Sequence, residues 1–151
     1  MNGSTMRNTS RKAEILRSVL STEGVDAAEF FAARISPGQI WDVFARHDVP
    51  ASSTIDNDIG DVEISKWFMG LLEQVEVNRE CYVSLGVRDE PWIRIGIADR
   101  RALLALWCGL TSRDLLIVDG PQRSVLGLQE EEYEYLAHWE AVDVLLRGKE
   151  P

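Results

Sequence analysis

Apolar residues in the first half of the chain recur at the three- and four-residue spacing of amphipathic helices. This spacing predicts four helices, over residues 11–20, 26–35, 36–47 and 62–75. The clearest start is at Ser36, where Pro37 suits the first helical position and Gln39 completes a capping box. The segment between the third and fourth helices is rich in polar residues and predicts a loop.

From Cys81 onward the pattern changes to the two-residue alternation of strands that face a core on one side. The alternating apolar residues are Val83, Leu85 and Val87 in one run and Ile93, Ile95 and Ile97 in the next. Pairing Val87 with Ile93 places both runs on one face of an antiparallel pair. The connection should therefore hold an odd number of residues or contain a bulge.

The last third of the chain mixes both patterns. It predicts a helix over 98–110, a strand buried on both faces over 115–118, a short return strand over 124–128 and a final helix over 130–146. Leu136, Trp139 and Val142 form the apolar side of that final helix. Together the elements predict an α+β fold, in which a helical N-terminal half packs on a small, mostly antiparallel sheet of about four strands with a C-terminal helix. We expect residues 1–10 to be a disordered tail and 11–151 to form one domain, since 151 residues suit a single core.

The formal net charge of −9 limits the kinds of partner that the chain can attract. A negative surface repels phosphate backbones and anionic lipids, so we expect neither nucleic acid nor membrane as a partner. No apolar run reaches the length of a membrane span and the N-terminus lacks the pattern of a signal peptide, so we expect a cytoplasmic protein. Cys81 and Cys108 both lie in apolar surroundings, and we expect both to be reduced and buried.

The sequence contains none of the motifs that mark common catalytic or cofactor sites. Its two histidines, His47 and His138, fall in different predicted helices and no nucleophile motif accompanies them. The acidic segment 56–63 resembles a calcium loop but misplaces the glycine and the last glutamate of that pattern. Glycine-rich phosphate loops are absent as well. We therefore predict no enzyme activity, no catalytic residue, no metal site and no cofactor.

The first candidate for partner binding is an acidic cluster at the start of the predicted final helix. It consists of Glu130, Glu131, Glu132, Tyr133 and Glu134. Glutamates in a first helical turn are stabilised by the helix dipole, so the cluster can be a solvated helix end. A tyrosine among acids is equally suited to bind a basic protein surface, and both interpretations stay open.

A second candidate is the strand face opposite the predicted core, with Tyr82, Trp92 and Arg94. Exposed aromatic residues mark interaction sites, so Trp92 and the nearby Asp89 complete the predicted binding surface if no helix covers this face. The alternative is that an N-terminal helix buries it. The helices at 26–35 and 36–47 also suggest a helix-turn-helix unit, but Asp42 and the net charge oppose contact with phosphates.

Residues 104–111, Leu-Ala-Leu-Trp-Cys-Gly-Leu-Thr, lead into the apolar run 115–118. This segment resembles the helix and strand of barstar-type ribonuclease inhibitors, although the tyrosine-glycine loop of that family has no counterpart. Residues 114–134 are similar to the ends of small actinobacterial immunity-like proteins. These resemblances imply an acidic protein-binding module, with an immunity or inhibitor protein that occludes a basic toxin or nuclease as its sharpest form. The alternative is a transcriptional regulator or regulatory adaptor that uses the N-terminal helices.

Overall fold

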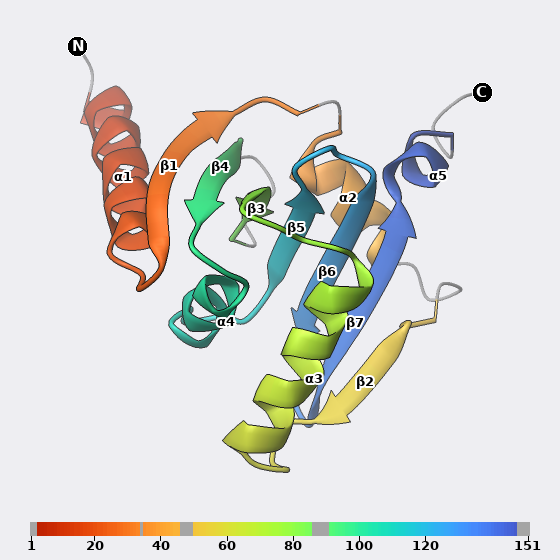
Figure 1. Ribbon diagram of the computed structural model, residues 1–151. Coiled ribbons are helices and arrows are strands. Elements are labelled where there is room, and N and C mark those ends of the chain that lie inside the picture. Colours follow the sequence, from red (N-terminus) through yellow and green to blue (C-terminus); the bar gives the residue numbers. More distant parts are fainter. Residues whose placement is uncertain (1–2, 34, 46–49, 86–90, 148–151) are drawn as a thin grey trace.

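The computed structural model describes residues 3–33, 35–45, 50–85 and 91–147, with residues 3–10 described as backbone alone. Within these residues the chain forms five helices and a seven-stranded sheet (Figure 1). The elements in chain order are α1 (Gly3–Leu20), β1 (Val25–Phe31), α2 (Pro37–Phe44), β2 (Ser53–Asp56), α3 (Asp61–Gln74), β3 (Glu80–Ser84), β4 (Trp92–Ile97), α4 (Arg101–Cys108), β5 (Leu115–Asp119), β6 (Ser124–Glu130), β7 (Glu134–Ala141) and α5 (Val142–Arg147).

The sheet is larger than the sequence pattern predicts. Its strands lie in the order β1-β4-β3-β5-β6-β7-β2, and every neighbouring pair is antiparallel. The predicted fold class, a helical half on about four strands, is therefore wrong. Two of the additional strands, β1 and β2, lie in the half that was predicted to be helical, and β7 replaces the middle of the predicted final helix.

The predicted helix over 26–35 is largely β1. Its aromatic residues pair with β4, so that Phe30 lies opposite Ile93 and Phe31 opposite Trp92. Aromatic side chains favour a pleated, half-buried surface, and the tertiary pairing outweighs the helical spacing. Because this segment is a strand, the helix-turn-helix unit considered from the sequence does not form.

The predicted final helix over 130–146 contains β7 in its middle, and only its last five residues, 142–146, are helical as part of α5. Tyr135, Ala137 and Trp139 alternate along the strand and pack on the same core, as period-two spacing requires. The helical interpretation relied instead on Leu136, Trp139 and Val142, whose three-residue spacing suits a helix, whereas in β7 Leu136 and Trp139 lie on opposite faces of the strand.

Several predicted elements are confirmed. Ser36 caps α2 and its hydroxyl accepts from the Gln39 backbone N–H, while the Gln39 side chain accepts from the Ser36 backbone N–H. β3 and β4 are antiparallel and place their valine and isoleucine residues on one face, as predicted. Their register differs, since Ile93 lies opposite Val83. Val87 lies outside the described residues.

Both faces of the sheet are covered by helices, and each face has its own core (Figure 1). The larger core contains residues of α1, α3 and α4, and the smaller one contains residues of α2 and α5. Two cores explain why β5 is buried along its whole length, as predicted. In the part of the chain that the structure describes, none of the helices has the length and apolar character needed to cross a membrane.

Candidate functional site

The acidic run that was predicted to begin a helix forms the tip of a β-hairpin. β6 ends at Glu130, β7 begins at Glu134, and Glu130 lies opposite Tyr135. The Glu131 backbone N–H donates to the Glu134 carbonyl oxygen at 2.8 Å and closes the turn. No helix begins at this point, so a helix dipole does not explain these glutamates.

A second acidic segment, residues 56–63, lies beside this hairpin. β2 is the neighbour of β7, and Asp56 at the end of β2 lies opposite Glu134. We call residues 56–63 and 130–134 together the acidic tip. With eight of the 25 acidic residues and none of the 16 lysines and arginines, the acidic tip accounts for nearly all of the formal net charge of −9.

Asn57 joins the two segments of the acidic tip. Its side-chain amide donates to the carbonyl oxygens of Glu131 and Glu132, at 3.3 and 3.0 Å. Its backbone N–H donates to the carbonyl oxygen of Tyr133 at 3.0 Å. These bonds bridge 74 and 75 residues of sequence and tie the loop after β2 to the hairpin turn.

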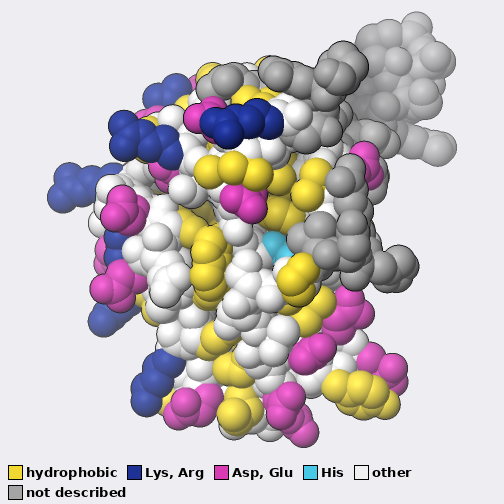
Figure 2. Space-filling view, turned by 90° about the vertical axis from the view of Figure 1, so that its right-hand side faces the viewer, with side chains coloured by type: hydrophobic (Ala, Val, Ile, Leu, Met, Phe, Trp, Pro, Cys, Tyr) yellow, Lys and Arg dark blue, Asp and Glu magenta, His cyan; other side chains and the backbone are white. Residues whose placement is uncertain are grey.

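The acidic tip also exposes apolar side chains. Five large hydrophobic residues are exposed in the described part of the chain, and three of them belong to the acidic tip. They are Ile59, Val62 and Tyr133, with exposed fractions of 53%, 67% and 74%. Figure 2 shows acidic and hydrophobic side chains gathered together along the lower edge of this face. Exposed apolar side chains interspersed with carboxylates are a composition that protein interfaces use.

The base of the acidic tip is anchored in the larger core. The Tyr135 hydroxyl accepts from Nη1 of Arg113 at 3.0 Å, and the Arg113 guanidinium lies 5.0 Å from the centre of the buried Trp107 ring. The Trp107 indole N–H donates to the Arg113 carbonyl oxygen at 3.0 Å. Oδ1 of Asp114 accepts from the Glu130 backbone N–H at 2.8 Å. The strand ends that carry the charged turn are therefore fixed to the core by these hydrogen bonds.

The second predicted surface, on the opposite strand face, is largely covered. Trp92 is 1% exposed and its indole N–H donates to the Ile35 carbonyl oxygen at 2.7 Å, so it cannot contact a partner. Tyr82 is buried as well, and Arg94 forms ion pairs with carboxylates of the neighbouring strands. Asp89 lies outside the described residues. Of the predicted binding residues, the structure brings together only those from 130 to 134.

His138 lies on β7, not on a helix, and its ring is buried. The ring stacks on Phe44 with centroids 5.0 Å apart, next to Gly127 of the neighbouring strand. Neither ring nitrogen has a hydrogen-bond partner in the part of the chain that the structure describes. Burial lowers the pKa of His138, which favours the neutral ring. Among the described residues, no carboxylate orients this ring as one does in a catalytic triad. His47 lies outside the described residues.

The two cysteines differ in exposure. Cys81 is buried as predicted, and burial, with repulsion from Glu80 and Asp119, raises the pKa of its thiol to about 12. Such a thiol stays protonated and is a poor nucleophile. Cys108 is exposed, so its predicted burial is wrong. Among the described residues, no group of three His, Cys, Asp or Glu side chains is arranged to hold a metal ion.

Sequence reasoning missed three residues of the acidic tip, namely Asn57, Ile59 and Val62. Both acidic runs are evident in the sequence, but residues 56–63 were considered only as a calcium loop and were not predicted to lie beside residues 130–134. The signal that could have joined them is the short alternation of Ser53, Thr54, Ile55 and Asp56, which forms β2 with partly buried and exposed positions in turn. A four-residue alternation is too short to identify a strand without its partner.

Comparisons of the chain with protein-family models, with curated proteins and with solved structures found no match. The resemblance to barstar-type inhibitors therefore stays a prediction. The geometry of the site alone supports the function proposed next.

Proposed function

We propose that this chain is a protein-binding module and that its acidic tip binds a basic surface of a partner protein. The observation that carries the proposal is the joining of two acidic segments, far apart in sequence, which together expose three large apolar side chains. Charge alone suits a solvated surface. Charge combined with exposed apolar groups on an anchored turn is suited to recognition of a partner protein.

The composition of the acidic tip specifies the chemistry of the partner. Eight carboxylates attract a surface rich in lysine and arginine and accelerate its encounter with the tip. Tyr133, exposed at the turn, supplies a large side chain that binds at a small cost in conformational entropy. The partner should therefore present an apolar depression bordered by basic residues.

In its sharpest form, the proposal makes the chain an inhibitor of immunity type. A basic groove that binds the phosphates of a nucleic acid offers the charge that the acidic tip complements. Occupying such a groove blocks a nuclease or another basic toxin without any chemical step. Steric and electrostatic occlusion is then sufficient for function.

Charge reversal tests the proposal. The tagged wild-type protein is used to capture partners from cells of its source, and the same capture is repeated with Glu131→Lys combined with Glu132→Lys. A matched control reverses two exposed glutamates on helices outside the tip, Glu14→Lys with Glu73→Lys. We expect the wild type and the control to retain a basic partner and the tip variant to lose it.

The captured partner then tests the inhibitory form. Binding should weaken as salt rises, because the attraction is between exposed charges. A nuclease or toxin assay of the purified partner, with and without the wild-type chain, should show inhibition that the tip variant lacks. Equal capture by the tip variant would exclude the acidic tip as the binding site.

A further inference from the structure

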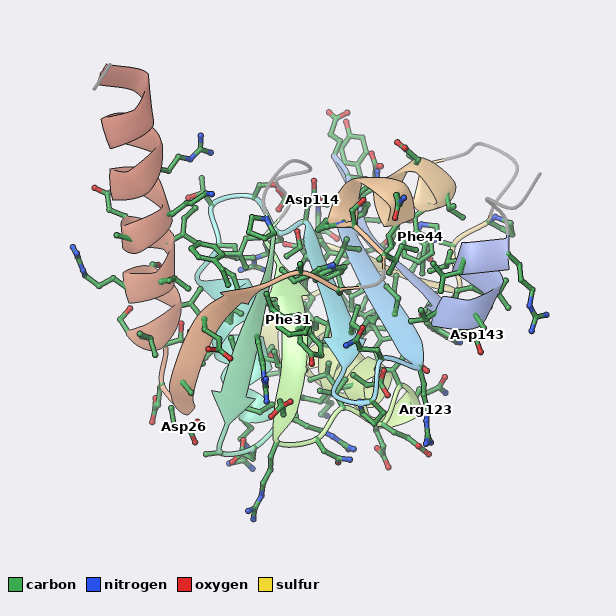
Figure 3. The ribbon with its side chains drawn as sticks, turned by 90° about the horizontal axis from the view of Figure 1, so that it is seen from above. Asp26, Phe31, Phe44, Asp114, Arg123 and Asp143 are labelled. Atoms are coloured by element: carbon green, nitrogen blue, oxygen red, sulfur yellow. The ribbon has the colours of Figure 1, made fainter. Side chains whose placement is uncertain are left out.

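A cavity of about 460 Å³ lies at the other end of the sheet from the acidic tip. It is formed by α3, the segment that leads into β3 and the start of α4. The start of β3 pairs with the end of β5, and the end of β5 pairs with the start of β6, whereas the acidic tip is at the far end of β6. In Figure 3, Arg123 marks the end of the sheet that holds the cavity and Asp114 marks the end that holds the tip.

Three arginines line this cavity, in a chain whose net charge is negative. They are Arg79, Arg100 and Arg101. None of them forms an ion pair with a carboxylate among the residues that the structure describes. Three positive charges brought close together repel one another, and a bound anion relieves that repulsion.

One acidic residue, Asp99, also lines the cavity, and its single negative charge can balance only one of the three arginines. Its Oδ1 accepts from the Arg101 backbone N–H at 2.8 Å and so stabilises the first residue of α4. The next two backbone N–H groups of the helix donate to the carbonyl oxygens of Asp99 and Arg100, at 3.2 and 3.1 Å. Because these donors are occupied, the guanidinium groups are the groups left to bind an anion.

The side chain of Arg100 and the backbone of Arg79 are held in place before any ligand binds. Nε of Arg100 donates to the carbonyl oxygen of the buried Val77 at 2.6 Å, which leaves the two terminal nitrogens of its guanidinium available. The carbonyl oxygen of Arg79 accepts from the Ile97 backbone N–H at 2.8 Å and fixes the segment before β3 to the end of β4. These two parts of the site lose little entropy on binding, whereas the exposed side chains of Arg79 and Arg101 are ordered by the ligand.

We propose that this cavity binds a small molecule that carries a phosphate group. Guanidinium groups bind phosphate oxygens with paired hydrogen bonds. Three guanidinium groups carry more positive charge and more donors than a ligand with a single carboxylate group would use. The volume falls in the range of small-molecule sites, and Met69 and Val77 offer an apolar wall to the organic part of the ligand. The Asn78 amide adds a neutral donor and acceptor. This site is separate from the acidic tip, so the two proposals succeed or fail independently.

The test uses the full chain and three probes, namely inorganic pyrophosphate, adenosine monophosphate and a single-stranded oligonucleotide. Binding is followed by amide chemical shifts at Asn78 and Arg101 during titration at constant ionic strength. The variant is Arg79→Gln with Arg101→Gln, two exposed side chains that make no described hydrogen bond, and the control is Arg123→Gln at the same end of the sheet. Urea unfolding checks that each variant is folded.

We expect pyrophosphate or adenosine monophosphate to shift the two amides, and the double variant to weaken that binding by about tenfold or more. Tighter binding of adenosine monophosphate than of pyrophosphate would show that the apolar wall contributes. The site is refuted if neither small probe binds more strongly than chloride. Binding of the oligonucleotide alone, or equal weakening by Arg123→Gln, would also overturn it.

Discussion

One neutral side chain, Asn57, holds the two acidic segments together, and its replacement tests how the acidic tip is built. Asn57→Ala removes the amide donors to the carbonyl oxygens of Glu131 and Glu132. The backbone N–H of residue 57 still donates to the Tyr133 carbonyl oxygen. The hairpin turn would then be held from this side by one hydrogen bond.

The size of the effect follows from the two bonds. A neutral hydrogen bond contributes about 0.5–1.5 kcal/mol net to stability. One bond is 3.3 Å long and both are exposed, so the pair lies at the low end. Asn57→Ala should therefore lower the free energy of unfolding by about 1 kcal/mol. Asn57→Asp should cost more, because it places a carboxylate against two carbonyl oxygens within a tip of eight acids.

Urea unfolding and amide hydrogen exchange measure both variants. The Glu131 amide reports on closure of the turn, and a local loss of about 1 kcal/mol should speed its exchange about fivefold. Asn78→Ala, which changes an exposed asparagine outside the tip, is the control and should leave this amide unchanged. An Asn57→Asp variant as stable as the wild type would refute the role assigned to the amide.

Three further predictions concern the smaller core. In Gly127→Ala the new Cβ would lie 2.6 and 2.7 Å from two ring carbons of Phe44, so urea unfolding should show a loss of about 1–3 kcal/mol. Trp92→Phe removes the donor to the Ile35 carbonyl oxygen and should cost about 1–3 kcal/mol by the same measurement, whereas unchanged stability would show that the bond contributes nothing. The pKa of His138 is lowered from its usual 6.5, so between the two values the unfolded chain binds more protons than the folded one. Stability should be complete above pH 6.5 and fall as pH drops below it, and a pH series of unfolding curves should show this decline weakened in His138→Leu.

The elements that could be predicted from the sequence are those with a long or well-capped pattern. The capping box of Ser36 and Gln39 fixes the start of α2, because two reciprocal bonds favour one position. The apolar run that begins at Leu115 is buried on both faces, and only a strand between two cores satisfies it. The alternation around Ile93 likewise identifies β4 without reference to its neighbours.

The missed strands depend on partners that are distant in sequence. β1 gains its hydrogen bonds from β4, about 65 residues later in the chain, and β2 gains them from β7. Phe30 and Phe31 fit a helix as well as a strand when considered alone, and tertiary pairing decides between them. The role of Asn57 could not be predicted for the same reason, since its amide reaches the hairpin turn only when β2 lies beside β7.

The exposed charge of residues 130–134 could be predicted although their secondary structure was predicted wrongly, and the reason is physical. Four glutamates within five residues must reach solvent whether the chain forms a helix or a hairpin, because burial of an unpaired charge is costly in either. The hairpin changes what accompanies them. A helix would spread residues 130–134 around its axis, whereas the turn places Tyr133 at the exposed apex and brings Ile59 and Val62 of a distant segment to the same end of the sheet. The composition of such a surface can be predicted from a local run of residues, but its shape follows from strand order.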